Sequence, residues 1–277
     1  MTTQLMSPML LVSEQHLASR LDALAQVSGL DSALIAQFGD FIRTAPDEDL
    51  FRASPYRYAQ RVGIGDRQAV DLFLYATHAG ILEFNWGVLC PRCAAFITSP
   101  GGLRSLHTHA YCDLCQIDSD VVIDDNVEVA FTVAPSVRTI RFHSPSTINL
   151  KRDWRRLFFS TSQTMTPFVL RQIEQLLVAD AFVPANAIYQ FEHMCVAGQY
   201  LIALPQHHAQ AALEVDPQHA EHTVHFDLLD GAVVPARQRV GPGPVIVRVH
   251  NRTDTLNVVG LIHRPLAVTL DPDAPES

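Results

Sequence analysis

Positive charge is scarce in this chain of 277 residues. It has 20 lysines and arginines against 29 aspartates and glutamates, which gives a formal net charge of −9. Non-specific binding to nucleic acid or to an anionic membrane surface requires the opposite sign, so we expect neither. Long hydrophobic runs are also missing, because no stretch approaches the roughly 18 apolar residues of a membrane span. The N-terminal stretch lacks the basic segment and the cleavage site of an export signal, so we expect an unprocessed protein.

Cysteine is also rare, but its distribution is informative. Four of the five cysteines form two pairs separated by 18 residues, Cys90-Pro-Arg-Cys93 and Cys112-Asp-Leu-Cys115. Each pair can present two thiolates from one tight turn, and two such turns complete a tetrahedral four-cysteine zinc site of the ribbon type. This clustering argues for metal in a reducing cytoplasm rather than for a disulfide framework. The fifth, Cys195, is interpreted as a small hydrophobic residue buried in a strand.

Signatures of catalysis are absent from the sequence. It contains no Gly-x-Ser-x-Gly, no phosphate-binding Walker loop and no dinucleotide fingerprint. Four thiolates would close the coordination sphere of a zinc ion, whereas a catalytic zinc keeps one position open for water. His107 and His109 stand close enough to replace a cysteine, but with four thiolates available we expect them in the loop or around the ligands. We therefore predict a structural zinc and no enzymatic activity.

Two other groups of potential metal ligands do not form a readable pattern. His193 and Cys195 share one face of a predicted strand but lack the further ligands of a copper site. His222 and His225 stand an odd number of residues apart, so on a strand they point to opposite faces. We predict no copper site.

Residues 1–88 are predicted to form a helical, winged-helix-like unit. Apolar residues recur at helical spacing, and the candidate helix caps are Ser13, Asp31 or Ser32, and Asp66. A short helix, the turn Gly63-Ile64-Gly65, a helix over 66–78 and a strand over 81–88 follow in the order of a winged helix. This unit carries six basic and ten acidic side chains. A recognition helix needs cations for phosphates, so DNA binding is the weaker alternative to protein docking or plain packing.

The remainder is predicted to be rich in strands. A zinc ribbon is expected over 89–118, with a turn at Ser99-Pro100-Gly101-Gly102, and a β-sandwich-like domain over 119–268. Short alternating stretches separated by turn residues are typical of an antiparallel sandwich. One inserted helix is expected to begin at Thr166-Pro167 and to continue to Leu177, and residues 269–277 are expected to be a disordered tail. The predicted fold class is therefore α+β and multidomain.

One segment reverses the charge of the chain. Six basic residues fall within 19 positions whose only acid is Asp153; they are Arg138, Arg141, Lys151, Arg152, Arg155 and Arg156. Such a cluster can bind a phosphate, a nucleotide or an acidic segment of a partner. The alternative is pairing with the abundant acids of the chain itself. Trp154, among these residues, is interpreted as a packing anchor.

The order of several segments resembles a region of unknown function that precedes the catalytic domain in many bacterial class III adenylate and guanylate cyclases. The matching segments are Ala79-Gly-Ile-Leu-Glu-Phe-Asn-Trp86 running into Cys90-Pro-Arg-Cys93, then Cys112-Asp-Leu-Cys115, Val127-Glu-Val-Ala-Phe131, Pro135-Ser-Val-Arg138, Phe142-His-Ser-Pro-Ser-Thr-Ile-Asn-Leu-Lys-Arg-Asp-Trp154 and Gly241-Pro-Gly-Pro-Val-Ile-Val-Arg-Val-His-Asn251. The resemblance implies a zinc-containing accessory or regulatory module, and it carries over no catalytic residue. Since the sequence stops at Ser277, we expect no cyclase domain in it.

Together these features predict a cytoplasmic, non-catalytic zinc-binding module that regulates or scaffolds a signalling partner. Protein–protein contacts are the expected mode of action, and a small-molecule ligand of unknown identity is a further option. The alternative is a DNA-binding regulator that uses the winged helix and the zinc ribbon.

Overall fold

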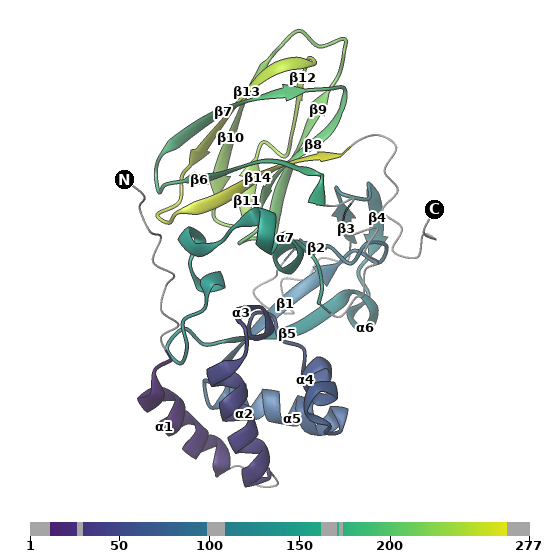
Figure 1. Ribbon diagram of the computed structural model, residues 1–277. Coiled ribbons are helices and arrows are strands. Elements are labelled where there is room, and N and C mark those ends of the chain that lie inside the picture. The colour runs from purple at the N-terminus through teal and green to yellow at the C-terminus, as the bar shows by residue number, and fades with distance from the viewer. Residues whose placement is uncertain (1–11, 27–29, 99–108, 162–170, 172–173, 265–277) are drawn as a thin grey trace. The chain divides into compact units, whose positions relative to one another are not determined.

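The computed structural model describes residues 12–26, 30–98, 109–161, 171 and 174–264. It confirms the α+β class, with helices in the N-terminal part and sheets in the C-terminal part (Figure 1). The chain forms two compact units, each built from two separate segments. Unit 1 comprises 1–85 and 129–147, and unit 2 comprises 86–128 and 148–277. The grouping of 129–147 with the N-terminal helices differs from the boundaries expected from sequence.

Unit 1 is built on amphipathic helices. Their bounds are α1 Glu14–Ala25, α2 Ser32–Thr44, α3 Asp47–Leu50, α4 Pro55–Val62 and α5 Asp66–His78. The Asp31 side chain caps α2 by accepting a hydrogen bond from the Ala33 N–H. Proline opens α4, and Gly63 ends it in a left-handed conformation with φ of 76°. The apolar faces meet in a core that includes Leu17, Phe38 and Phe73.

The predicted order of helix, turn, helix and strand is present in α4, α5 and β1 (Leu82–Leu89). A winged helix is not confirmed: β1 lies between β2 and β5 in a three-stranded sheet of order β2-β1-β5, and β2 follows the first cysteine pair. In this sheet β2 is Phe96–Thr98 and β5 is Val127–Val133. The segment after β5 contains two short 3-10 turns, η2 (Arg141–His143) and η3 (Pro145–Thr147).

Unit 2 contains two large sheets. The five-stranded sheet has the order β12-β9-β8-β14-β6, and the four-stranded sheet has the order β11-β10-β13-β7. The strands are β6 Leu177–Val183, β7 Ile188–Cys195, β8 Gly198–Leu204, β9 Ala209–Val215, β10 Thr223–Leu229, β11 Ala232–Val234, β12 Arg237–Val240, β13 Gly243–Asn251 and β14 Asn257–Arg264. Smaller elements of this unit are the hairpin of β3 (His109–Cys112) and β4 (Ile117–Asp120), with α6 (Ile123–Asn126) and α7 (Leu150–Phe158).

Alternate residues of both large sheets are buried in one hydrophobic core. On β13, for example, Val245, Val247 and Val249 are fully buried, while Arg248 between them is exposed. Most strand pairs of the two sheets are antiparallel, as expected, but β10 pairs with β13 and β12 pairs with β9 in parallel. After β11 the chain enters β12 in the other sheet and returns in β13, so these partners are not joined by hairpins.

Some expected elements fall on residues that are not described. They are the turn at 99–102, His107, most of the helix expected over 166–177, and the tail 269–277. At the end of that expected helix the structure differs from prediction, because Leu177 begins strand β6. None of the helices in the described ranges has the length and apolar character needed to cross a lipid bilayer.

Candidate metal centre

The four paired cysteines lie together in unit 2. Strand β1 leads into Cys90, and Cys93 precedes β2; Cys112 ends β3, and Cys115 precedes β4. Each pair therefore occupies the turn of an antiparallel hairpin. All four sulfur atoms lie within 4.8 Å of one another, although the two pairs are far apart in sequence.

The two turns have matching backbone geometry. The Ala94 N–H donates to the Cys90 carbonyl at 2.9 Å, and the Gln116 N–H donates to the Cys112 carbonyl at 2.7 Å. Ala94 and Gln116, each directly after the second cysteine of its pair, both adopt a left-handed conformation with φ of 54°. That conformation is unfavourable for residues with a Cβ, so the turns impose it twice at equivalent positions. The Cys115 N–H also approaches the Cys112 sulfur at 3.4 Å.

The spacing of the sulfur atoms fits a tetrahedral ion. Cys93 Sγ and Cys112 Sγ are 3.9 Å apart, far longer than a disulfide, and all four residues are free thiols. Two sulfurs at about 2.3 Å from one zinc ion lie roughly 3.8 Å apart in a tetrahedron. The residues present can therefore hold a metal ion.

The site is closed off by hydrophobic packing. Cys90 and Cys112 are each 2% exposed and Cys93 is 5% exposed. They form one core cluster with Trp154 and Phe159, which pack edge to face. The prediction that Trp154 is a packing anchor is confirmed. Substrate access to the thiols is thus restricted within the described part of the chain.

The electrostatics of the cluster favour a cation. Hydrogen bonding, first with Cys112, lowers the pKa of the Cys90 thiol. The same kind of contact, again first with Cys112, raises the pKa of Cys93 and of Cys115. A bound divalent cation would stabilise all four cysteines as thiolates.

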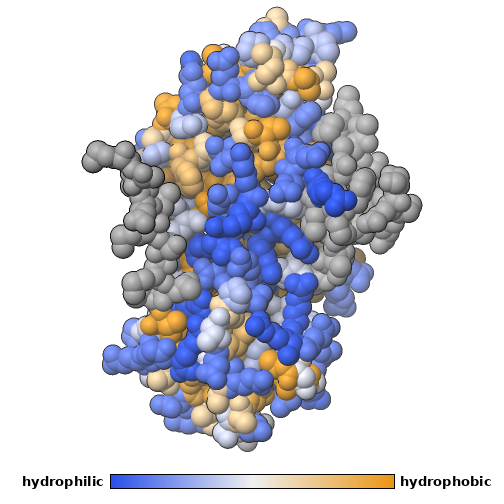
Figure 2. Space-filling model, viewed as in Figure 1, coloured by the Kyte–Doolittle hydropathy of each residue, from blue (hydrophilic) through white to orange (hydrophobic). Residues whose placement is uncertain are grey.

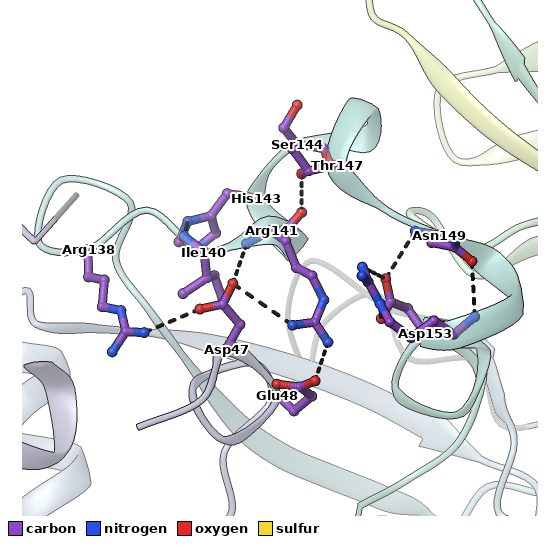
Figure 3. A network of polar contacts seen from close by, with 11 residues as sticks. Asp47, Glu48, Arg138, Ile140, Arg141, His143, Ser144, Thr147, Asn149 and Asp153 are labelled. Carbon is purple, nitrogen blue, oxygen red and sulfur yellow. Dashed lines mark hydrogen bonds and ion pairs between the residues drawn. The ribbon is translucent and has the colours of Figure 1, made fainter. Parts of the chain in front are cut away.

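Two residues of the predicted basic cluster, Arg138 and Arg141, form ion pairs inside unit 1. Arg138 is 1% exposed; it donates to the Ile42 carbonyl at 2.7 Å and pairs with Asp47 at 3.3 Å (Figure 3). Arg141 pairs with Glu48, and its backbone N–H donates to Asp47 at 2.9 Å. Internal pairing, one of the two alternatives considered for this segment, therefore accounts for Arg138, which cannot reach an external anion.

The other basic residues belong to unit 2. Asn149 caps α7 by accepting from the Arg152 N–H, and Arg152 also pairs with the buried Asp153 at 2.8 Å (Figure 3). Lys151 is exposed, whereas Arg155 and Arg156 are half-buried. The six residues are therefore divided between two units rather than gathered on one.

A small cavity lies beside the cysteine cluster. Its volume is about 50 Å³, and its lining includes Phe96, Leu114, Trp154, Phe158 and Ile262. Pockets for drug-sized ligands are several times larger, at roughly 300–1,000 Å³. The cavity does not fit a nucleotide. The interior of the sandwich is occupied by buried side chains.

Cys195 is separate from the metal centre. It is 2% exposed in the core between the large sheets, as expected for a small hydrophobic residue. Burial raises the pKa of its thiol to about 11, so it is protonated at neutral pH.

The left-handed conformation of Ala94 and Gln116 was not predicted from the sequence, because glycine, the usual signal for that conformation, is missing at both positions.

The structure thus defines an α+β protein with a four-cysteine centre at the turns of two hairpins, in which three of the cysteines are buried. The chain belongs to a family of unknown function, DUF5939, whose model matches residues 14–265. No curated protein and no solved structure matches it.

Proposed function

We propose that the chain is a non-catalytic, cytoplasmic zinc-binding module that regulates or scaffolds a signalling partner. The observation that carries this proposal is the cysteine centre itself. Two turns of matching geometry bring four thiols together within a hydrophobic cluster. Four sulfur ligands satisfy zinc completely, and they leave no position at which the ion could activate water or substrate. The zinc would then be structural, in a fold of the zinc-ribbon type.

The outer face of the sandwich supports action through protein contacts. Strand β7 lies at one end of the four-stranded sheet. Ile188 is 62% exposed and Met194 is 66% exposed on this strand, and Val196 directly after it is 55% exposed. Figure 2 shows hydrophobic residues interspersed with polar ones on the visible surface over these sheets. Exposed apolar groups on a strand at the end of a sheet are suited to binding another protein.

The resemblance to the region that precedes class III cyclase domains supports a signalling partner. We therefore propose a cyclase catalytic domain of that class as the first partner to test. The cavity beside the cysteines does not support a nucleotide ligand, because of its small volume.

Binding of the zinc-loaded chain to a purified class III cyclase catalytic domain tests the proposal. We expect saturable binding with a change in the rate of cyclic nucleotide formation, weakened by the double variant Ile188→Ser, Met194→Ser. Ile123→Ser is the matched control, since Ile123 is 58% exposed on α6. Absence of binding, together with nucleotide turnover by the chain alone, would refute the proposal.

DNA binding is the weaker candidate. The α5 helix exposes Arg67 and Asp71, and its first turn carries Asp66. This mixture of charges does not resemble a recognition surface for phosphates. A salt-dependent mobility shift of duplex DNA would reverse the ranking.

A further inference from the structure

A second group of potential metal ligands lies on the outer face of the four-stranded sheet. His225 and Asp227 are two residues apart on β10, so their side chains leave the same face, while Phe226 between them is buried in the core. Strand β13 runs parallel to β10, and His250 is the register partner of Asp227. The pairing of these strands thus brings three ligand residues together from two distant segments.

The donor atoms of these side chains converge. One donor atom from each lies within 4.8 Å of the others. Asp227 Oδ1 is 3.2 Å from His225 Nε2 and 3.3 Å from His250 Nδ1. Ligand atoms at about 2.0–2.1 Å from a tetrahedral zinc ion are roughly 3.3 Å apart. A zinc ion could therefore take the place of the hydrogen-bonded protons between these side chains with little movement of the side chains.

We infer that His225, Asp227 and His250 form a site for a divalent cation of borderline softness, such as zinc. Two imidazoles and one carboxylate are ligands that such ions prefer. The three residues are partly exposed, so remaining coordination positions are open to water or to an outside ligand. The site differs from the cysteine centre in ligand chemistry and exposure, and it does not depend on the proposed function.

Arg252 forms an ion pair with the Asp227 carboxylate of this site. Its Nε lies 2.9 Å from Asp227 Oδ1, the same oxygen that faces both histidines. An approaching cation and this guanidinium compete for that oxygen. The Arg252 side chain is 50% exposed, so it can withdraw into solvent at small cost. Arg252 therefore holds the Asp227 carboxylate in place without a metal ion and lowers the affinity of the three residues for one.

Calorimetric titration of the full chain with Zn²⁺ tests the inference, with imidazole ¹⁵N NMR as the second readout. We expect a binding event that shifts the resonances assigned to His225 and His250. His250→Ala should weaken this event at least about tenfold. Arg252→Gln should tighten it roughly two- to fivefold. His219→Ala is the matched control, since His219 is exposed and outside the cluster.

The NMR readout follows these histidines directly, so the result does not depend on whether the cysteines also bind zinc. The side chains lie on the outer face of the sheet, so the variants should keep the fold, which far-UV circular dichroism checks. Unshifted His225 and His250 resonances at saturating zinc would overturn the inference. In a chain whose cysteine centre is already loaded with zinc, a further event of unchanged affinity in the His225→Ala, His250→Ala double variant would also overturn it.

Discussion

Replacing Cys112 by serine should abolish the zinc binding proposed for the cysteine centre and unfold the two hairpins around it. Cys112 is 2% exposed, and its sulfur is 3.9 Å from that of Cys93. Its carbonyl also accepts the hydrogen bond that closes the second turn. A serine hydroxyl is a much poorer zinc ligand than a thiolate and would be buried among apolar side chains.

The expected loss of zinc affinity follows from the sharing of one zinc ion among four thiolates. Structural zinc sites contribute about 10–16 kcal/mol of apparent binding energy in peptides, so an equal share is about 2.5–4 kcal/mol per thiolate. That share corresponds to roughly a 10²- to 10³-fold loss of zinc affinity. It is also a large part of the typical stability of a domain, about 5–15 kcal/mol.

The assay combines zinc content with hydrogen exchange. In the His225→Ala, His250→Ala background we expect about one zinc per chain, substoichiometric zinc after Cys112→Ser, and lost protection over 86–98 and 109–120. Cys195→Ala is the matched control: it deletes a buried thiol outside the centre, so it should cost about 1 kcal/mol and leave the zinc content unchanged. Full zinc content and unchanged protection in Cys112→Ser would refute the reasoning.

Three further variants test particular contacts. Ala94→Gly relieves a left-handed residue, so the free energy of unfolding should stay level or rise by up to about 1 kcal/mol in denaturant titration, and a clear decrease would contradict this. Asp47→Asn leaves the buried Arg138 guanidinium without its counter-charge and should lower the free energy of unfolding by about 3–5 kcal/mol. Asp49→Asn, in an exposed ion pair, should lower it by less than about 1 kcal/mol. Equal losses in the two variants would refute this difference between the pairs. Burial lowers the pKa of His143 below its ordinary 6.5, and its Nδ1 accepts a hydrogen bond from a backbone N–H. The folded state disfavours the protonated imidazole. The stabilising contribution of neutral His143 is therefore complete above about pH 6.5 and is lost as the pH falls below that value. His143→Gln should therefore flatten the acid limb of a stability–pH curve, and an unchanged slope would contradict this.

Local signals in the sequence predicted the cysteine centre and much of the helical part. Spacing within Cys90-Pro-Arg-Cys93 and Cys112-Asp-Leu-Cys115 is a short-range property, and so are the cap at Asp31 and the stop at Gly63. Each depends on residues within one turn of the chain. These features could therefore be predicted without knowledge of the tertiary structure.

Features that depend on distant pairing were not predictable. The convergence of His225 and Asp227 with His250 requires the parallel register of β10 and β13, which no local pattern encodes. The burial of Arg138 depends on Asp47, which lies 91 residues earlier. Charge counting therefore grouped Arg138 with exposed residues such as Lys151, although packing separates them.

The interior positions of β13 and β14 bear on how the protein assembles during synthesis. Strand β13 lies between β10 and β7, and β14 lies between β8 and β6. Both strands leave the ribosome after all their neighbours, so the four-stranded sheet cannot close until residue 251 has been translated, and the five-stranded sheet until residue 264. Until then β7 and β6 present unpaired backbone groups. A chain interrupted before Gly243 would lose the joining strand of both sheets, and we expect it to be a substrate for chaperones or proteases.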